Sequence, residues 1–345
     1  MEMRIKGRQV LKGEVEASSS KNAILPILAA TLLASDAISI HNVPRIKDVA
    51  VIIELMKSLG MKVERQGGSL LVQAFNGAGQ PPYELVRQIR ASFLIMGPIL
   101  ATRGLVRIAL PGGCAIGTRP IDLHLKGFEA LGARISLSRG NVVARADRLR
   151  GNHVYLDYPS VGATENILMA AALAEGTTHI ENAALEPEVV DLANFINSMG
   201  GEISGAGTNI IRIKGVKKLT GSEYTPIPDR IEAGTYMVAG AATGGSVLVK
   251  NVVPEHVKAI TAKLVESGAS VEEGDMEIRV TRTSEIKPLY IKTLPHPGFP
   301  TDMQAQFMAY LSMAKGSSVI SESVFENRFM HVQELLRMGA AIKIE

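Results

Sequence analysis

The chain has 345 residues, 46% hydrophobic and 21% charged, which excludes intrinsic disorder and predicts a compact protein of two or three domains. A net charge of +3 is too small to indicate nucleic-acid binding, and a single cysteine excludes an internal disulfide framework and favours a reducing compartment, so we expect a cytoplasmic protein. The longest nearly apolar run, residues 23–34, is too short for a membrane span, which needs about 20 residues.

A helical pattern that ends at a glycine and continues into a short apolar strand recurs five times. These marker glycines are Gly60, Gly132, Gly200, Gly268 and Gly339, so the spacings are 72, 68, 68 and 71 residues. A period this regular predicts one supersecondary unit repeated along the chain.

The first block illustrates the repeated unit. Residues 21–34 form a nearly all-apolar, alanine-rich helical pattern, which we expect to be buried on all sides. A strand is predicted over 37–44, then a helix over 48–60 with one apolar face, then a strand over 61–66. The third and fourth blocks repeat this order.

Short alternating runs predict further strands at residues 69–74, 141–146 and 210–215. Each block then has the order strand, helix, strand, helix, strand, strand, which predicts mixed sheets covered by helices and an α/β or α+β fold. The loop 224–230, with two prolines, separates the third block from the fourth and is the expected domain boundary.

The starts of the inner helices carry polar side chains in most blocks. If the repeat brings these starts together, their free N–H groups and partial positive charges favour an anionic ligand such as a phosphate. Simple helix capping is the alternative, and it suits Thr301 and Asp302 well. The residues concerned are Lys21, Asn22, Arg90, Ser92, Thr164, Glu165, Glu232 and Asp302.

The loop 111–124 departs from the repeat and contains three glycines, Cys114, Arg119, Asp122 and His124. The glycines allow the backbone to approach a ligand closely, and a neighbouring Arg favours a reactive thiolate. An inert cysteine is the alternative. No metal-ligand spacing and no nucleotide-binding glycine motif is present, so we predict no metal site.

Seven motifs together carry a resemblance to a known family. They are KNAILP, PGGCAIGTRPIDLH, SVGAT, ENAALEPEVVD, PDRIEAGT, PHPGFPTDMQAQF and VFENRFMH. The chain closely resembles the enolpyruvyl transferases over its whole length, and the cysteine loop resembles the branch that acts on UDP-N-acetylglucosamine rather than on shikimate 3-phosphate.

The resemblance implies a two-domain inverted α/β barrel built from six βαβαββ units. We expect a first domain from residues 1–19 and 229–345 and a second from 20–228, which carries the Cys114 loop. The sequence contains five of the six units, and we expect the last, about 70 residues long, to be missing through truncation.

The implied reaction transfers the enolpyruvyl group of phosphoenolpyruvate to the 3′-hydroxyl of UDP-N-acetylglucosamine with release of phosphate. It is the first committed step of peptidoglycan precursor synthesis and needs no cofactor. Cys114 resembles the proton donor and the target of fosfomycin, Asp302 resembles the base, and Lys21 resembles the residue that neutralises developing charge. The matching substrate-binding residues are Asn22, Arg90, Arg119, Pro120, Ile121, Asp122, Leu123, Ser160, Val161, Gly162 and Val324.

Two alternatives remain open from the sequence. An inactive or truncated relative would bind the UDP-sugar as a binding or regulatory module. The branch acting on shikimate 3-phosphate is the lesser alternative, because it lacks the cysteine loop. We expect the two substrates as the only partners, with no nucleic acid, membrane or obligate protein partner.

Overall fold

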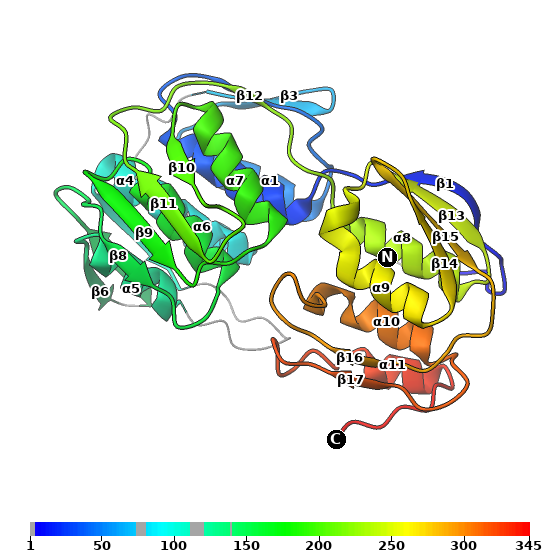
Figure 1. The fold of residues 1–345 in the computed structure, drawn as a ribbon. Coiled ribbons are helices and arrows are strands. Elements are labelled where there is room, and N and C mark those ends of the chain that lie inside the picture. Colours follow the sequence, from blue (N-terminus) through cyan, green and yellow to red (C-terminus); the bar gives the residue numbers. More distant parts are fainter. Residues whose placement is uncertain (1–3, 74–80, 111–120, 139) are drawn as a thin grey trace. The chain divides into compact units, whose positions relative to one another are not determined.

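A computed structural model describes residues 4–73, 81–110, 121–138 and 140–345, without the side chain of Arg90. The chain divides into two compact units (Figure 1). The terminal unit contains the residues up to 18 and those from 228 to the end, and the insert unit contains the described residues between 19 and 227.

The insert unit consists of three blocks of helices and strands. The first block contains α1 (Lys21–Ala30), the 3-10 turn η1 (Thr31–Leu33), β2 (Ile38–Ile40), α2 (Lys47–Ser58), β3 (Val63–Gln66) and β4 (Ser69–Val72). The second contains α3 (Tyr83–Val86), the 3-10 helix η2 (Arg90–Ile95), α4 (Met96–Arg103), β5 (Leu105–Ala109), α5 (Asp122–Ala130), β6 (Arg134–Ser138) and β7 (Asn141–Arg145). The third contains β8 (His153–Tyr155), α6 (Val161–Ala171), β9 (Thr177–Glu181), α7 (Pro187–Ser198), β10 (Glu202–Ser204) and β11 (Ile210–Lys214), and β12 (Glu223–Tyr224) follows it.

The terminal unit repeats this plan in two further blocks. The fourth block contains β1 (Lys12–Glu16), α8 (Arg230–Ala242), β13 (Ser246–Lys250), the 3-10 helix η3 (Pro254–Val257), α9 (Lys258–Glu266), β14 (Ala269–Glu273) and β15 (Glu277–Arg282). The fifth contains β16 (Tyr290–Lys292), the 3-10 turn η4 (Thr301–Met303), α10 (Gln304–Leu311), β17 (Val319–Ser321) and α11 (Val332–Arg337).

The sheets confirm the repeated unit and the α/β class. In the third block β8 pairs in parallel with β9, and β11 pairs antiparallel with β9 and β10. The first block has the same sheet, but β12 takes the place of the leading strand beside β2. In the fourth block β1 takes that place beside β13. Two blocks therefore borrow their first strand from a distant part of the sequence.

The marker glycines end the outer helix of each block. All five, from Gly60 to Gly339, have φ between 92° and 98°, a region that L side chains rarely adopt. The N–H of Gly132 donates to the carbonyl of Glu129 at 2.9 Å, and the next N–H donates to Phe128 at 2.9 Å. This is the glycine-terminated helix end that satisfies the last carbonyl groups, so the repeat of the glycines has a backbone cause.

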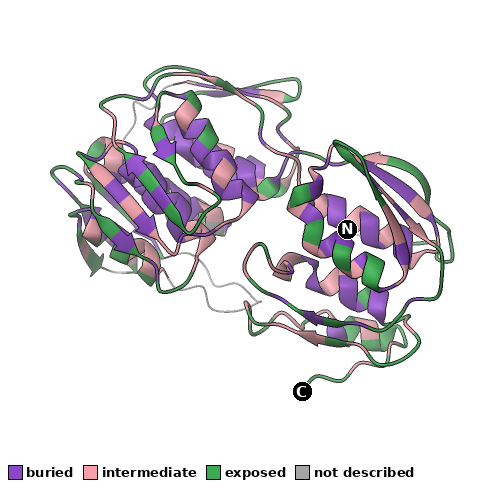
Figure 2. Cartoon of the chain, viewed as in Figure 1, coloured by how far each residue is buried: buried purple, intermediate pink, exposed green. Residues whose placement is uncertain are grey.

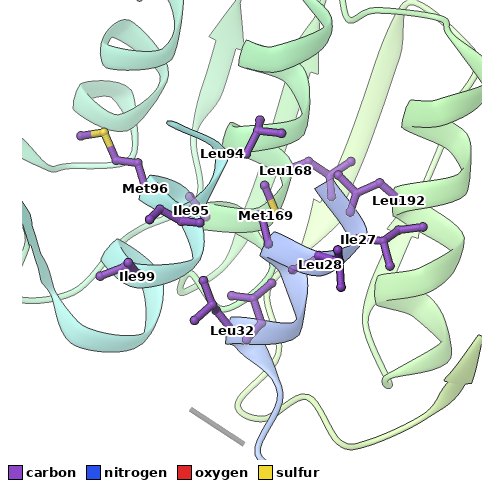
Figure 3. Packing of buried hydrophobic residues seen from close by; sticks show 14 of the residues in the cluster. Ile27, Leu28, Leu32, Leu94, Ile95, Met96, Ile99, Leu168, Met169 and Leu192 are labelled. Carbon is purple, nitrogen blue, oxygen red and sulfur yellow. The ribbon is translucent and has the colours of Figure 1, made fainter. Parts of the chain in front are cut away.

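The inner helices form the core of the insert unit (Figure 2). Residues 23–30 of α1 and 163–171 of α6 are all buried. Figure 3 shows Leu28 of α1 and Met169 of α6 among the residues of one hydrophobic cluster. The prediction that residues 21–34 are buried on all sides is confirmed for residues 23–34, whereas Lys21 is exposed and Asn22 partly exposed. The alanines of these helices leave room for close packing. Within the described part of the chain, no helix has the length and hydropathy needed to cross a membrane.

A buried carboxyl group fixes the segment at the end of the insert unit to α7. Asp191 is 2% exposed; its Oδ1 accepts from the Tyr224 hydroxyl at 2.6 Å and its Oδ2 from the Ile227 N–H at 3.1 Å. The Ile227 carbonyl in turn accepts from the Ser20 N–H at 2.8 Å. Burial raises the pKa of Asp191 from 3.8 to about 6, and the two hydrogen bonds oppose that rise.

We expect Asp191 to lower the stability of the insert unit as the pH rises from about 4 to 7. The native carboxyl holds its proton up to a pKa of about 6 and the unfolded one only up to 3.8, so ionising it in place costs about 3 kcal/mol. Asp191→Asn lacks this effect. Hydrogen exchange of the α7 amides measures the opening free energy. We expect the difference between the wild type and Asp191→Asn to fall by about 3 kcal/mol as the pH rises. Asp275→Asn, on an exposed turn, is the control, and a pH-independent difference would contradict the expectation.

Candidate functional site

The first turn of α6 presents three of the predicted binding residues. Ser160 caps the helix, its hydroxyl accepting from the Ala163 N–H at 3.4 Å, and Val161 and Gly162 are the first two helical residues. These three residues are partly exposed, whereas the rest of the helix is buried. Free N–H groups and the helix dipole at such an end favour an anionic group.

The first turn of α5 packs against this end of α6. Ile121 precedes α5, and Asp122 and Leu123 are its first residues. A Cβ atom on Gly162 would lie 3.3 Å from Cε1 of His124, so the imidazole sits directly on the α6 turn. The structure thus brings the segment 121–123 together with Ser160, Val161 and Gly162, as a shared ligand requires.

Lys21 and Asn22 occupy the start of α1, as predicted. Ser20 caps this helix and accepts from the Ala23 N–H at 3.3 Å. The Lys21 ammonium lies 3.8 Å from Asp48 at the start of α2, and about half of its side chain is exposed. A lysine at a helix N-terminus adds a positive charge to an end that already favours anions.

Of the other predicted site residues of the insert unit, only some lie within the described residues. Cys114, Arg119 and Pro120 lie outside the described residues. Arg90 begins η2, and its backbone is joined to α6 because Asn166 Nδ2 donates to the Phe93 carbonyl at 3.0 Å. The helix η2, which Arg90 begins, therefore packs on α6.

In the terminal unit, a polar network joins Asp302 to Val324. The Arg328 guanidinium donates to Asp302 Oδ1 at 2.6 Å and to the Thr301 hydroxyl at 3.2 Å. Glu322 accepts from that hydroxyl at 2.9 Å and from the Val324 N–H at 2.8 Å. Asp302 is 38% exposed and Arg328 20%, so the carboxylate is held in one orientation and still reaches solvent.

Two expectations about helix starts are wrong. Thr301 and Asp302 do not cap their helix, since their side chains bond to Glu322 and Arg328. Glu165 is not at a helix start, because α6 begins four residues earlier. Its side chain is 3% exposed, and burial together with the charges of Glu188 and Glu186 raises its pKa well above the usual range.

Sequence reasoning missed Arg328 and Glu322, although both lie within or beside a motif that it used. Arg328 belongs to the motif VFENRFMH, which predicted only Val324 as a site residue, and its guanidinium is suited to bind a carboxylate. Glu322 accepts from two N–H groups of its own turn, Val324 and Phe325, and from the hydroxyls of Thr293 and Thr301, which lie 29 and 21 residues away, so the sequence alone does not reveal the network. Among the described residues, no group of three or more metal-ligating side chains is arranged to hold a metal ion.

A known protein family matches nearly the whole chain. The model of EPSP synthase (3-phosphoshikimate 1-carboxyvinyltransferase) matches residues 5–345. The chain belongs to this family of carboxyvinyltransferases. The recognition made from the seven motifs is therefore confirmed, as is the enzyme class.

Curated relatives within the family are similar to nearly all of this chain. UDP-N-acetylglucosamine 1-carboxyvinyltransferase 1 of Caldanaerobacter subterraneus subsp. tengcongensis is 59% identical over 335 residues, 97% of this chain and 81% of the relative. UDP-N-acetylglucosamine 1-carboxyvinyltransferase 2 of Carboxydothermus hydrogenoformans is 57% identical over 344 residues, 99% of this chain and 82% of the relative.

Solved structures of the family have the same fold. The enolpyruvyl transferase NikO from Streptomyces tendae matches with a TM-score of 0.85 at 24% identity, over 96% of this chain and 80% of that one. EPSP synthase from Acinetobacter baumannii matches with a TM-score of 0.69 at 19% identity, over 90% of this chain and 73% of that one. These likenesses confirm the two-domain α/β fold of the family.

Proposed function

We propose that this carboxyvinyltransferase transfers the enolpyruvyl group of phosphoenolpyruvate to the 3′-hydroxyl of UDP-N-acetylglucosamine and releases phosphate. The observation that carries the proposal is the identity of 55–59% to relatives named for this activity, over 97–99% of the chain. The product would enter peptidoglycan precursor synthesis, in the cytoplasm.

In the proposed site, the insert unit binds the anionic parts of both substrates. Lys21 and Asn22 hold phosphoenolpyruvate together with Arg119, which binds its phosphate. The free N–H groups at the α6 start support a role for Ser160, Val161 and Gly162 in binding the UDP moiety. Arg90, Pro120, Ile121, Asp122, Leu123 and Val324 complete the sugar-nucleotide site.

The proposed reaction is an addition followed by an elimination. The 3′-oxygen bonds to C2 of phosphoenolpyruvate, its proton passes to Asp302, and Cys114 delivers a proton to C3, which gives a tetrahedral intermediate. The C2–O bond to phosphate then breaks and phosphate leaves, while C3 returns a proton to the Cys114 thiolate and the double bond is restored. Lys21 stabilises the charge that develops during addition.

The test is phosphate release from phosphoenolpyruvate, with UDP-N-acetylglucosamine or shikimate 3-phosphate as acceptor, by this chain and its Cys114→Ser variant. We expect release with the UDP-sugar only, and a loss of at least about 100-fold in the variant, because a hydroxyl is a much weaker acid than a thiol. Release with shikimate 3-phosphate alone would assign the chain to the other branch. UDP-sugar binding without turnover would identify a binding module.

A further inference from the structure

We propose that Asn166 is a positioning residue that fixes His124 as its neutral tautomer, with the ring proton on Nε2 at the first turn of α6. The tautomer is set by contacts within the insert unit alone. Its consequence for substrate rests on the function proposed above, because the α6 turn is the proposed site of the UDP moiety.

The amide of Asn166 has only one possible orientation. The side chain is completely buried; its Oδ1 accepts from the Gly97 N–H at 2.7 Å, and its Nδ2 donates to the Phe93 carbonyl at 3.0 Å. A backbone N–H only donates and a carbonyl only accepts. Rotating the amide by half a turn would set donor against donor and acceptor against acceptor, which is costly in a buried site.

This orientation determines which nitrogen of His124 carries the proton. Asn166 Nδ2 lies 3.1 Å from His124 Nδ1, and an amide NH2 group is a donor only. His124 Nδ1 must therefore accept, and the ring proton resides on Nε2. A doubly protonated ring would turn its Nδ1–H toward the amide hydrogens, so the charged form is disfavoured.

The proton-bearing edge of the ring faces the α6 turn. A Cβ atom on Gly162 would lie 3.4 Å from His124 Nε2 and 3.3 Å from Cε1, so this edge of the ring is in contact with the α6 turn. The Phe93 ring meets the imidazole edge to face at 5.2 Å and limits its rotation. The result is a neutral, oriented N–H donor beside the N–H groups of the helix end.

A close backbone approach holds Asn166 itself in place. A Cβ atom on Gly97 would lie 2.3 Å from the Asn166 carbonyl oxygen, so α4 and α6 meet at a position that only glycine allows. Asn166 thus connects three elements, η2, α4 and α5, to α6. In the proposed function its effect on substrate passes through His124, which makes it a positioning residue.

The decisive measurement is the tautomer of His124, read from 15N NMR of protein with 15N-labelled imidazole and no substrate. The chain has seven histidines, and the signals of His124 are assigned as those lost in His124→Gln. We expect a bare Nδ1 and a protonated Nε2 in the wild type. A proton on Nδ1, or equal populations of both tautomers, would overturn the proposal.

Substitution of Asn166 adds a second readout. In Asn166→Asp the carboxylate accepts from Nδ1–H, so the proton should move to Nδ1 or the ring should become charged. In Asn166→Leu the amide that donates to Nδ1 is lost, so a larger share of the Nδ1-protonated tautomer is expected. If either variant fails to fold, the wild-type spectrum still decides the tautomer. An unchanged bare Nδ1 in folded Asn166→Asp would overturn the role of Asn166.

The kinetic consequence separates positioning from general packing. We expect Asn166→Leu to raise KM for UDP-N-acetylglucosamine roughly tenfold, the effect of one hydrogen bond, while kcat and the KM for phosphoenolpyruvate stay within about threefold. His124→Gln should keep more affinity than His124→Ala, because its amide donor replaces Nε2–H. If Asn166→Leu changed kcat and both KM values to the same extent, Asn166 would have only a structural role. Absence of any activity would refute the proposed function and leave the tautomer result standing.

Discussion

Asp302→Asn is expected to lower kcat for enolpyruvyl transfer by about 10²–10⁴, the usual contribution of a general base. The amide is too weak a base to take the proton of the 3′-hydroxyl. It keeps an oxygen that accepts from Arg328, whose guanidinium lies 2.6 Å from Oδ1 in the native protein. The polar network around the position should therefore survive, and steady-state phosphate release measures the loss.

The control for this prediction separates chemistry from folding. The midpoint of thermal unfolding of Asp302→Asn should stay within about 2 °C of the wild type, since the amide oxygen still accepts from Arg328 and a partly exposed ion pair contributes only about 0–1 kcal/mol. Asp275→Asn, exposed on a turn of the terminal unit, should leave kcat unchanged. A kcat for Asp302→Asn within threefold of the wild type would remove Asp302 from its proposed role.

Glu322→Ala is expected to lower the stability of the terminal unit by about 3 kcal/mol and to weaken binding of the UDP-sugar. Its Oε1 accepts from Thr293, Val324 N–H and Phe325 N–H at 2.8, 2.8 and 3.1 Å, and the Thr293 hydroxyl has no access to solvent. Hydrogen bonds to a charged group contribute about 1.5–3 kcal/mol each, and water replaces part of them at this half-exposed turn. Chemical denaturation of the purified chain measures the loss.

Two variants delimit the effect of Glu322. Glu322→Gln keeps one acceptor oxygen for three of the four bonds, so we expect a loss of only about 1 kcal/mol. Glu272→Ala, exposed on β14, should change neither stability nor KM for the UDP-sugar. If Glu322→Ala unfolds at the same denaturant concentration as Glu322→Gln, the network does not hold the turn at Val324.

Much of the fold follows from the sequence because the signals are local. The marker glycines can be recognised directly in the sequence. Their positive φ explains why other residues are less suited to end these helices. The nearly all-apolar segment 21–34 is buried from Ala23 onward, although it ends as an α-helix at Ala30 and continues as a 3-10 turn. The predicted strand over 69–74 is found as β4, which ends at Val72.

The features that escaped the sequence depend on contacts between distant segments. Nothing in residues 223–224 signals that they lead the sheet of the first block, because that pairing joins Tyr224 to Ile40. Asn166 and His124 are 42 residues apart, and their hydrogen bond exists only through the packing of α5 on α6. Periodicity and motif spacing contain no information about such pairs.

The borrowed strand β1 also imposes an order in time on synthesis. Lys12 pairs with Ser246, so β1 emerges from a ribosome well before its partner exists. At about 5–20 residues per second the interval is roughly 12–50 s, long enough for the insert unit to be complete first. During that interval β1 has not yet paired with β13. Its sequence KGEVE has charged side chains at alternate positions, which deters a waiting nascent strand from pairing with a neighbouring polypeptide.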